Sequence, residues 1–202
     1  MSDNPATVKA SPPAPTKPFK VHLDPGHGGE DQGEEANGLV EAELNRNLAF
    51  FLGQLLTQRG YEVSVGPQTA ADGSKFPNSE RVALANRTGS VLLVLHENGG
   101  GGSYSMIEYM ADNPQSAGLA GFVQKRFQEL FKDLVSDVRL NVLQRGERGG
   151  ILLEGAKHSA VLLEPLFLDN PKHAAWAKDH NNRAALGTAI ADALDDLAKS
   201  AA

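Results

Sequence analysis

Four side chains capable of metal binding or acid–base chemistry stand next to apolar runs of this sequence. His27 follows the run VHLDP, His96 follows VLLVL, and Glu164 follows AVLL. Glu41 opens the next apolar stretch after His27. Because the carboxyl ends of parallel strands meet at one edge of a sheet, residues far apart in sequence can converge there. These four side chains are therefore the candidates for a functional site.

Two imidazoles and one carboxylate, with a fourth position left for water, form the ligand set of a hydrolytic zinc site. A further carboxylate is then needed to take a proton from the water and pass it to the leaving group. The candidates fit this count, but their spacing is not a compact signature such as H-E-x-x-H. Ordinary roles stay open, because Glu41 can simply favour a helix N-terminus and either histidine can be a hydrogen-bonded structural residue.

The other possible metal ligands of the sequence are few. The chain has no cysteine, which excludes disulfides, thiolate ligands and a cysteine nucleophile. His22 alternates within a predicted strand, His173 and His180 fall on a polar helix, and His158 precedes a strand at the end away from the proposed site. We interpret these four histidines as structural or solvated. The glycines around His27 form neither a GxGxxG motif nor a phosphate loop.

The elements that must position the candidates alternate between strand and helix. Short continuous apolar runs indicate buried strands, whereas apolar residues at every third or fourth position indicate helices. The predicted strands span residues 19–24, 61–65, 90–96, 103–110 and 159–167. The predicted helices span residues 41–59, 79–87, 119–134 and 181–199. This alternation predicts an α/β fold, a three-layer sandwich in which a twisted, mostly parallel sheet carries helices on both faces.

Length and charge limit the domain organisation and the partners. The chain has 202 residues and a net charge of −6, which fits one domain and argues against nucleic acid as a partner. Residues 1–18 are rich in proline and predict a flexible tail or linker, whereas residues 19–202 predict one globular domain. No signal peptide or run of transmembrane length is visible, so we expect no stable membrane association. We also expect a monomer.

Five sequence blocks occur in one order: VHLDPGHGG, GLVEAELNRNLAFFLGQLLTQRGYEVSV, SERVALANR, LLVLHENGG and AVLLEPLFLDNP. With these blocks the chain resembles, from about Phe19 to the C-terminus, the zinc-dependent N-acetylmuramoyl-L-alanine amidases of the amidase-3 type. That family consists of peptidoglycan hydrolases of bacteria and their phages. The resemblance implies the same α/β fold. It also implies that a zinc-activated water cleaves the amide between N-acetylmuramic acid and L-alanine of the peptidoglycan stem peptide.

The resemblance implies a role for each candidate residue. His27, Glu41 and His96 match the family's zinc ligands, and Glu164 matches its catalytic acid/base. Two details depart from the family pattern, since HENGG places Glu97 beside a ligand and EPLFLDN lacks a glycine that often follows the catalytic glutamate. Glu97 can point away from the metal, because neighbours along a strand alternate between the two faces.

Two other functions stay open. One is a zinc peptidase or other amide hydrolase that acts within the stem peptide, and the other is a non-catalytic cell-wall-binding module. The retained ligand positions and Glu164 favour the amidase, and Glu97 or Glu154 would be the next candidates for the base. The expected place of action is the cell wall, periplasmic or extracellular, reached by release through lysis or as an excised domain. The glycines of residues 98–103 predict either a mobile rim for a bulky polymer or a simple spacer.

Overall fold

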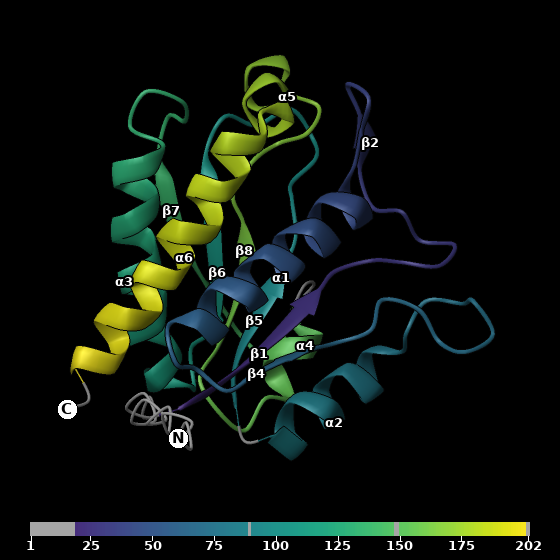
Figure 1. Cartoon of the computed structure of the whole chain (residues 1–202), viewed down its shortest axis with the longest axis vertical. Coiled ribbons are helices and arrows are strands. Elements are labelled where there is room, and N and C mark those ends of the chain that lie inside the picture. Colours follow the sequence, from purple (N-terminus) through teal and green to yellow (C-terminus); the bar gives the residue numbers. More distant parts are fainter. Residues whose placement is uncertain (1–18, 89, 148–149, 201–202) are drawn as a thin grey trace, which may run out of the picture.

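The computed structural model describes residues 19–88, 90–147 and 150–200, and the tail predicted for residues 1–18 lies outside them. In this part of the chain a six-stranded sheet lies between two layers of helices (Figure 1). The spatial order of its strands is β4 (Val63–Val65), β1 (Lys20–Pro25), β5 (Ser90–Leu95), β8 (Ala160–Glu164), β6 (Ser105–Met110) and β7 (Val138–Leu143). The helices are α1 (Glu41–Gln58), α2 (Asn78–Thr88), α3 (Pro114–Leu130), α4 (Ile151–Glu154), α5 (Pro171–Lys178) and α6 (His180–Ser200).

The helices divide between the two faces of the sheet. The longer helices α1, α3 and α6 cover one face, whereas α2 and the short α4 cover the other. The strands β4, β1, β5 and β8 are parallel, β6 is antiparallel to β8, and β7 is parallel to β6. The predicted three-layer sandwich with a mostly parallel sheet is therefore confirmed. No helix of the described segments is long and apolar enough to cross a membrane.

Strand β5 lies inside the sheet and is buried along its whole length. Val91, Leu93 and Leu95 enter the core under α1, α3 and α6, while the residues between them enter a smaller core under α2 and α4. This burial on both faces explains why the sequence shows a continuous apolar run instead of alternation. The run ends at the edge of the sheet where the candidate ligand His96 follows.

Strand β7 is an element that the sequence pattern does not predict. Its sequence VRLNVL alternates apolar and polar residues, and only Val138 and Leu143 are buried. The strand forms one edge of the sheet and pairs with β6 alone. An edge strand with one solvated side needs few apolar residues, so its hydrophobic signal is weak.

A short hairpin before α1 is also absent from the predicted elements. Strands β2 (Glu35–Ala36) and β3 (Leu39–Val40) pair antiparallel around Asn37 and Gly38. Both turn residues have positive φ angles, 53° and 74°, as expected for the two-residue turn that Asn-Gly favours. This dipeptide was the available signal in the sequence. Because α1 begins directly after the hairpin, the hairpin fixes the position of Glu41.

Candidate metal centre

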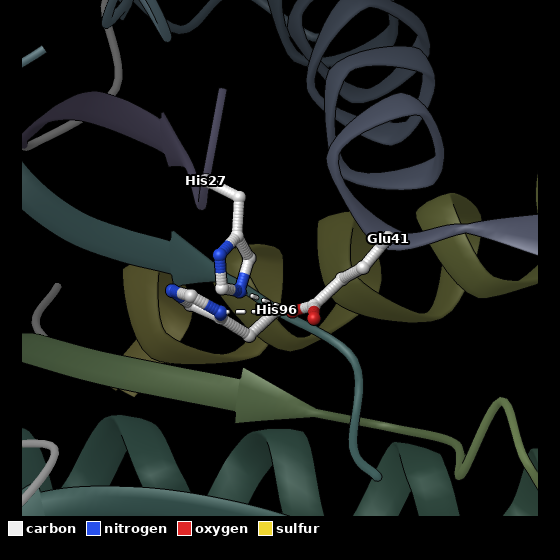
Figure 2. Close-up of side chains that lie close together, drawn as sticks. All are labelled: His27, Glu41 and His96. Carbon is white, nitrogen blue, oxygen red and sulfur yellow. Dashed lines mark hydrogen bonds and ion pairs between the residues drawn. The ribbon is translucent and has the colours of Figure 1, made fainter. Parts of the chain in front are cut away.

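His27, Glu41 and His96 form one cluster at the carboxyl end of the parallel strands (Figure 2). His27 follows β1 and His96 follows β5, and these neighbouring strands end together at the pair Pro25 and Leu95. Glu41 is the first residue of α1. Each side chain offers one ligand atom, and these atoms all lie within 4.8 Å of one another. The structure thus brings together three residues that come from separate segments of the sequence.

The Glu41 carboxylate lies between the two imidazoles. Its Oε1 atom is 3.1 Å from His27 Nε2 and 2.9 Å from His96 Nδ1. Its Oε2 atom accepts a hydrogen bond from the Glu34 N–H group (2.9 Å). Burial by itself raises the pKa of Glu41, but the contacts with His27 and His96 outweigh it and hold this pKa well below its usual range. An ionised carboxylate beside two imidazoles is a donor set that suits zinc.

The loop after β1 passes so close to these side chains that two of its positions require glycine. A Cβ atom at Gly26 would lie 2.4 Å from the His96 ring, and one at Gly33 would lie 2.4 Å from Glu41 Oε2. His27 itself has a φ angle of 61°, in the left-handed region that residues other than glycine rarely adopt. The glycine-rich sequence therefore serves to bring the backbone against the cluster.

Asp31 and Lys75 support His27 from outside the cluster, and sequence reasoning missed both. Asp31 Oδ1 lies 2.8 Å from His27 Nδ1, and its second oxygen pairs with the Lys75 ammonium. Burial raises the pKa of Asp31, but the contacts with Lys75 and His27 outweigh it and lower this pKa to about 2. An acid four residues after a candidate ligand was the available signal for Asp31. The sequence contained no comparable signal for Lys75, because Lys75 comes close to Asp31 only when the chain folds.

Arg81 of α2 supports the same loop through its backbone. Its side chain is 2% exposed, and Nη1 donates to Asp24 Oδ1 (3.0 Å) and to the Pro25 carbonyl oxygen (2.8 Å). Its Nη2 atom donates to the carbonyl oxygen of His27 (2.9 Å). A buried guanidinium needs such partners, and here they lock the end of β1 and the start of the ligand loop. The sequence pattern predicts the helix, but it contains no signal that assigns a role to this arginine.

Glu164 ends β8, the strand next to β5. The His96 N–H group donates to the Leu163 carbonyl oxygen (2.9 Å), so His96 and Glu164 occupy neighbouring positions on adjacent strands. The Oε2 atom of Glu164 is buried and has no hydrogen-bond partner among the described residues. Burial, followed by the negative charges of Glu108 and Glu41, raises the pKa of Glu164 to about 8. A carboxyl with this pKa can exchange a proton near neutral pH.

Glu108 on β6 is a second buried carboxyl near Glu164 that the sequence analysis missed. In the antiparallel pair of β6 and β8, Met106 lies opposite Glu164 and Glu108 lies opposite Leu162. Glu108 and Glu164 are therefore on the same face of the sheet, two positions apart along the strands. The Asn141 side-chain amide donates to Glu108 Oε1 (2.7 Å). An acid inside an otherwise apolar strand was the available signal.

Glu97 points away from the cluster, as the strand alternation allowed. Its backbone N–H group donates to Glu41 Oε1 (2.9 Å), but its own Oε2 accepts from the Leu166 N–H group (3.0 Å). Burial, followed by the negative charge of Glu41, raises the pKa of Glu97 well above its ordinary value. Glu154 lies on α4, where it accepts from the backbone N–H group of Gly146. Neither acid belongs to the cluster found among the described residues.

The remaining histidines lie outside the cluster. His22 and His173 are fully buried, and His173 fills the inner side of α5 instead of facing solvent with its polar residues. His22 Nδ1 lies 2.8 Å from Ser64 Oγ, and His173 Nδ1 accepts from the Phe167 N–H group (3.0 Å). These contacts agree with structural roles for both.

Comparison with known sequences identifies relatives along most of the chain. The model of the Amidase_3 family, described as N-acetylmuramoyl-L-alanine amidase, matches residues 21–196. The endolysin of Bacillus phage SPP1 is 32% identical over 164 residues, which covers 78% of this chain and 58% of the endolysin. The N-acetylmuramoyl-L-alanine amidase CwlM of Bacillus licheniformis is 38% identical over 166 residues, which covers 79% of this chain and 60% of CwlM. The chain thus spans less than two thirds of the length of these curated relatives.

Solved structures share the fold. The N-acetylmuramoyl-L-alanine amidase from Clostridium difficile 630 has a TM-score of 0.78 and 26% identity, and the match covers 92% of this chain and 99% of that one. The catalytic domain of CwlV, an N-acetylmuramoyl-L-alanine amidase from Bacillus (Paenibacillus) polymyxa var. colistinus, has a TM-score of 0.74 and 23% identity, with coverages of 88% and 97%. At its lower identity, the likeness to CwlV concerns the fold alone.

Proposed function

This chain belongs to the Amidase_3 family of N-acetylmuramoyl-L-alanine amidases, and we propose that it hydrolyses the amide between N-acetylmuramic acid and L-alanine of peptidoglycan. The observation that carries the proposal is the cluster of His27, Glu41 and His96, with Glu164 on the adjacent strand. The catalytic role falls to the domain predicted for residues 19–202. Its place of action would be the cell wall, periplasmic or extracellular.

We propose that His27, Glu41 and His96 hold a zinc ion. Two imidazole nitrogens and one carboxylate oxygen leave a fourth position for water, as in hydrolytic zinc sites. The fit rests on the donor set, since the ionised Glu41 oxygen lies within 3.1 Å of one ring nitrogen of each histidine. Asp31 keeps His27 Nδ1 occupied, which directs Nε2 to the cluster. When bound, zinc would lower the pKa of its water to about 7 and polarise the amide carbonyl.

Glu164 would move the proton. An amide nitrogen is a poor leaving group, so it must be protonated as the bond breaks. Glu164 can accept a proton from the attacking water and deliver it to the nitrogen, because its Oε2 has no competing partner among the described residues. Burial raises the pKa of Glu164 to about 8 in the metal-free protein, and a bound zinc cation would favour the ionised form that accepts the proton.

The test is mass spectrometry of peptidoglycan digested by the zinc-loaded protein. An amidase releases intact stem peptides that begin with L-alanine and leaves glycan strands without peptide. Cleavage inside the stem peptide would establish a peptidase or other amide hydrolase instead. Binding to peptidoglycan without any cleavage would establish a non-catalytic wall-binding module.

A further inference from the structure

A cavity of about 370 Å³ lies between α1, α5 and α6, on the face of the sheet opposite α2. Phe51, Trp176 and Leu186 are among the apolar side chains of its walls. Glu97 and Leu166, which follow β5 and β8, close the cavity on the side of the sheet. Figure 1 shows how α1 and α6 run across this face, with α5 leading into α6. The volume is at the lower end of the range of small-molecule sites, about 300 to 1,000 Å³.

Glu97 places a carboxyl group in this apolar lining. The residue is 8% exposed, and among the described residues only the Leu166 N–H group donates a hydrogen bond to its side chain (3.0 Å). No lysine, arginine or histidine of the described segments forms an ion pair with Glu97. Buried acids are normally paired with a cation or used in a function. A ligand that brings a positive charge would supply the missing partner.

We propose that this cavity is a binding site for a small organic ammonium ion with an apolar body. The amino group pairs with the carboxylate of Glu97, and the apolar body lies against Phe51 and Trp176. Aromatic walls favour this class of ligand for two reasons. They bury the apolar surface of the ligand, and their rings attract its cationic group. Binding at this site does not depend on the proposed amidase activity.

The cavity and the metal centre lie on opposite sides of one short segment. His96 and Glu97 are consecutive residues after β5, so their side chains point to opposite faces of the sheet. His96 faces Glu41, whereas Glu97 faces the cavity. The backbone N–H group of Glu97 nevertheless donates to Glu41 Oε1 (2.9 Å). The two sites are therefore separate but one residue apart.

The cavity lining also contains cationic residues, so an apolar anion is the alternative ligand. Arg183 and His180 both line the cavity, and His180 is exposed. The Arg183 guanidinium, however, already donates to the carbonyl oxygens of Ala177 (2.7 Å) and Lys178 (2.8 Å) at the end of α5. Two hydrogen bonds of the guanidinium are thus made within the protein, whereas Oε1 of Glu97 accepts none from the described residues. This difference favours a cationic ligand over an anionic one.

The test uses Trp176, the only tryptophan of the chain, as a fluorescent reporter of the cavity. The zinc-loaded protein is titrated with 2-phenylethylamine, 2-phenylethanol and 3-phenylpropanoate, which share an aromatic body and differ in charge. We expect a saturable fluorescence change with the amine, and at least tenfold weaker binding of the alcohol and the carboxylate. Equal or tighter binding of either one would overturn the pairing with Glu97, and so would the absence of saturable amine binding.

Three variants locate the binding. Glu97→Gln keeps an oxygen for the Leu166 N–H group but removes the charge, and should weaken amine binding at least tenfold. Glu43→Gln makes the same charge change on the exposed side of α1, and should leave amine binding unchanged. Ala184→Phe fills the cavity without altering a charge, and should abolish binding.

The Ala184→Phe variant also keeps the proposal testable if Glu97→Gln fails to fold. An amine could instead coordinate the zinc ion directly, and such binding would survive the filling of the cavity. Amine binding with unchanged affinity in Ala184→Phe would therefore overturn the proposal.

Discussion

His27 Nδ1 lies 2.8 Å from Asp31 Oδ1, so the opposite ring nitrogen, Nε2, is the one that faces Glu41. A carboxylate behind a histidine ligand fixes its tautomer and ring orientation and increases its basicity. Lys75 keeps Asp31 ionised and in place. The ligand loop is thus organised by residues that do not belong to the cluster.

Asp31→Asn should weaken zinc binding about 10- to 100-fold, the usual effect of losing a partner of a ligand. The substitution preserves shape but removes the charge that holds His27. Competition with a coloured zinc chelator measures the affinity directly, without relying on activity. Asp72→Asn, an exposed acid in the segment before Lys75, is the matched control. An unchanged affinity of Asp31→Asn would show that this contact has no part in metal binding.

A chelator should abolish peptidoglycan cleavage, and added zinc should restore it. His96→Ala removes one of three ligands and should neither retain zinc nor recover activity at stoichiometric metal. His180→Ala removes an exposed histidine outside the cluster and should behave like the unchanged protein. Metal content is measured by elemental analysis. Full activity of metal-free His96→Ala would contradict the metal-centre proposal.

Glu164→Gln should lower turnover by about 100-fold or more, the usual scale for losing a general acid/base. The variant should fold, keep its zinc and still bind peptidoglycan, because the amide nearly preserves the shape of the side chain. Glu154→Gln, on α4, should keep near-normal turnover. Loss of zinc from Glu164→Gln would make Glu164 a ligand. If the loss of turnover followed Glu154→Gln or Glu97→Gln instead, the assigned base would be wrong.

Glu164 should also make the stability of the metal-free protein depend on pH. Its pKa rises from 4.5 to about 8 on folding, so the native state holds this proton more tightly than the unfolded chain. The resulting stabilisation is complete below about pH 4.5 and is lost as the pH rises through about 8. Between about pH 5 and about pH 8, Glu164→Gln should lose less unfolding free energy than the unchanged protein, by on the order of 2 to 4 kcal/mol.

Urea unfolding at both pH values, with chelator present, measures this difference. Subtracting the two proteins removes the contributions of other titrating groups, such as the buried His22, whose pKa burial lowers to about 4. The exposed Glu62→Gln is the control and should lose as much stability as the unchanged protein. Equal losses in Glu164→Gln and the unchanged protein would disprove the raised pKa.

Substitutions at Gly100 and Gly101 test whether the glycine-rich segment 98–103 forms a mobile rim of the site. Both have positive φ angles, 99° and 78°, and a Cβ atom at either would have nothing within 4 Å. Changing both to alanine should therefore alter the conformation of the loop without a steric clash. We expect cleavage of intact sacculi to fall more than cleavage of a small muropeptide. Gly118→Ala, on the exposed side of α3, should affect neither substrate, and equal losses on both would favour a simple spacer.

The sequence by itself determined the strands and helices that carry the candidate residues, but not the edge strand β7 or the hairpin of β2 and β3. Continuous apolar runs predicted β5 and β8 because strands buried on both faces must be apolar throughout. Helical spacing predicted α1, α3 and α6 because one face of each packs on the sheet. The candidates His27 and Glu164 stood out because they follow such strands, where parallel sheets collect their functional groups.

Only the tertiary structure decided which distant residues meet. Lys75 reaches Asp31 across 44 positions of sequence, and Arg81 reaches Asp24 across 57, through a strand order that local patterns do not encode. The direction of β6 likewise decides that Glu108 lies on the same face as Glu164. Hydrophobic periodicity reports which face of an element is buried, but contacts between elements depend on how all the elements pack together. That packing also left a cavity beside Glu97, on the side of the sheet to which strand alternation directs this side chain.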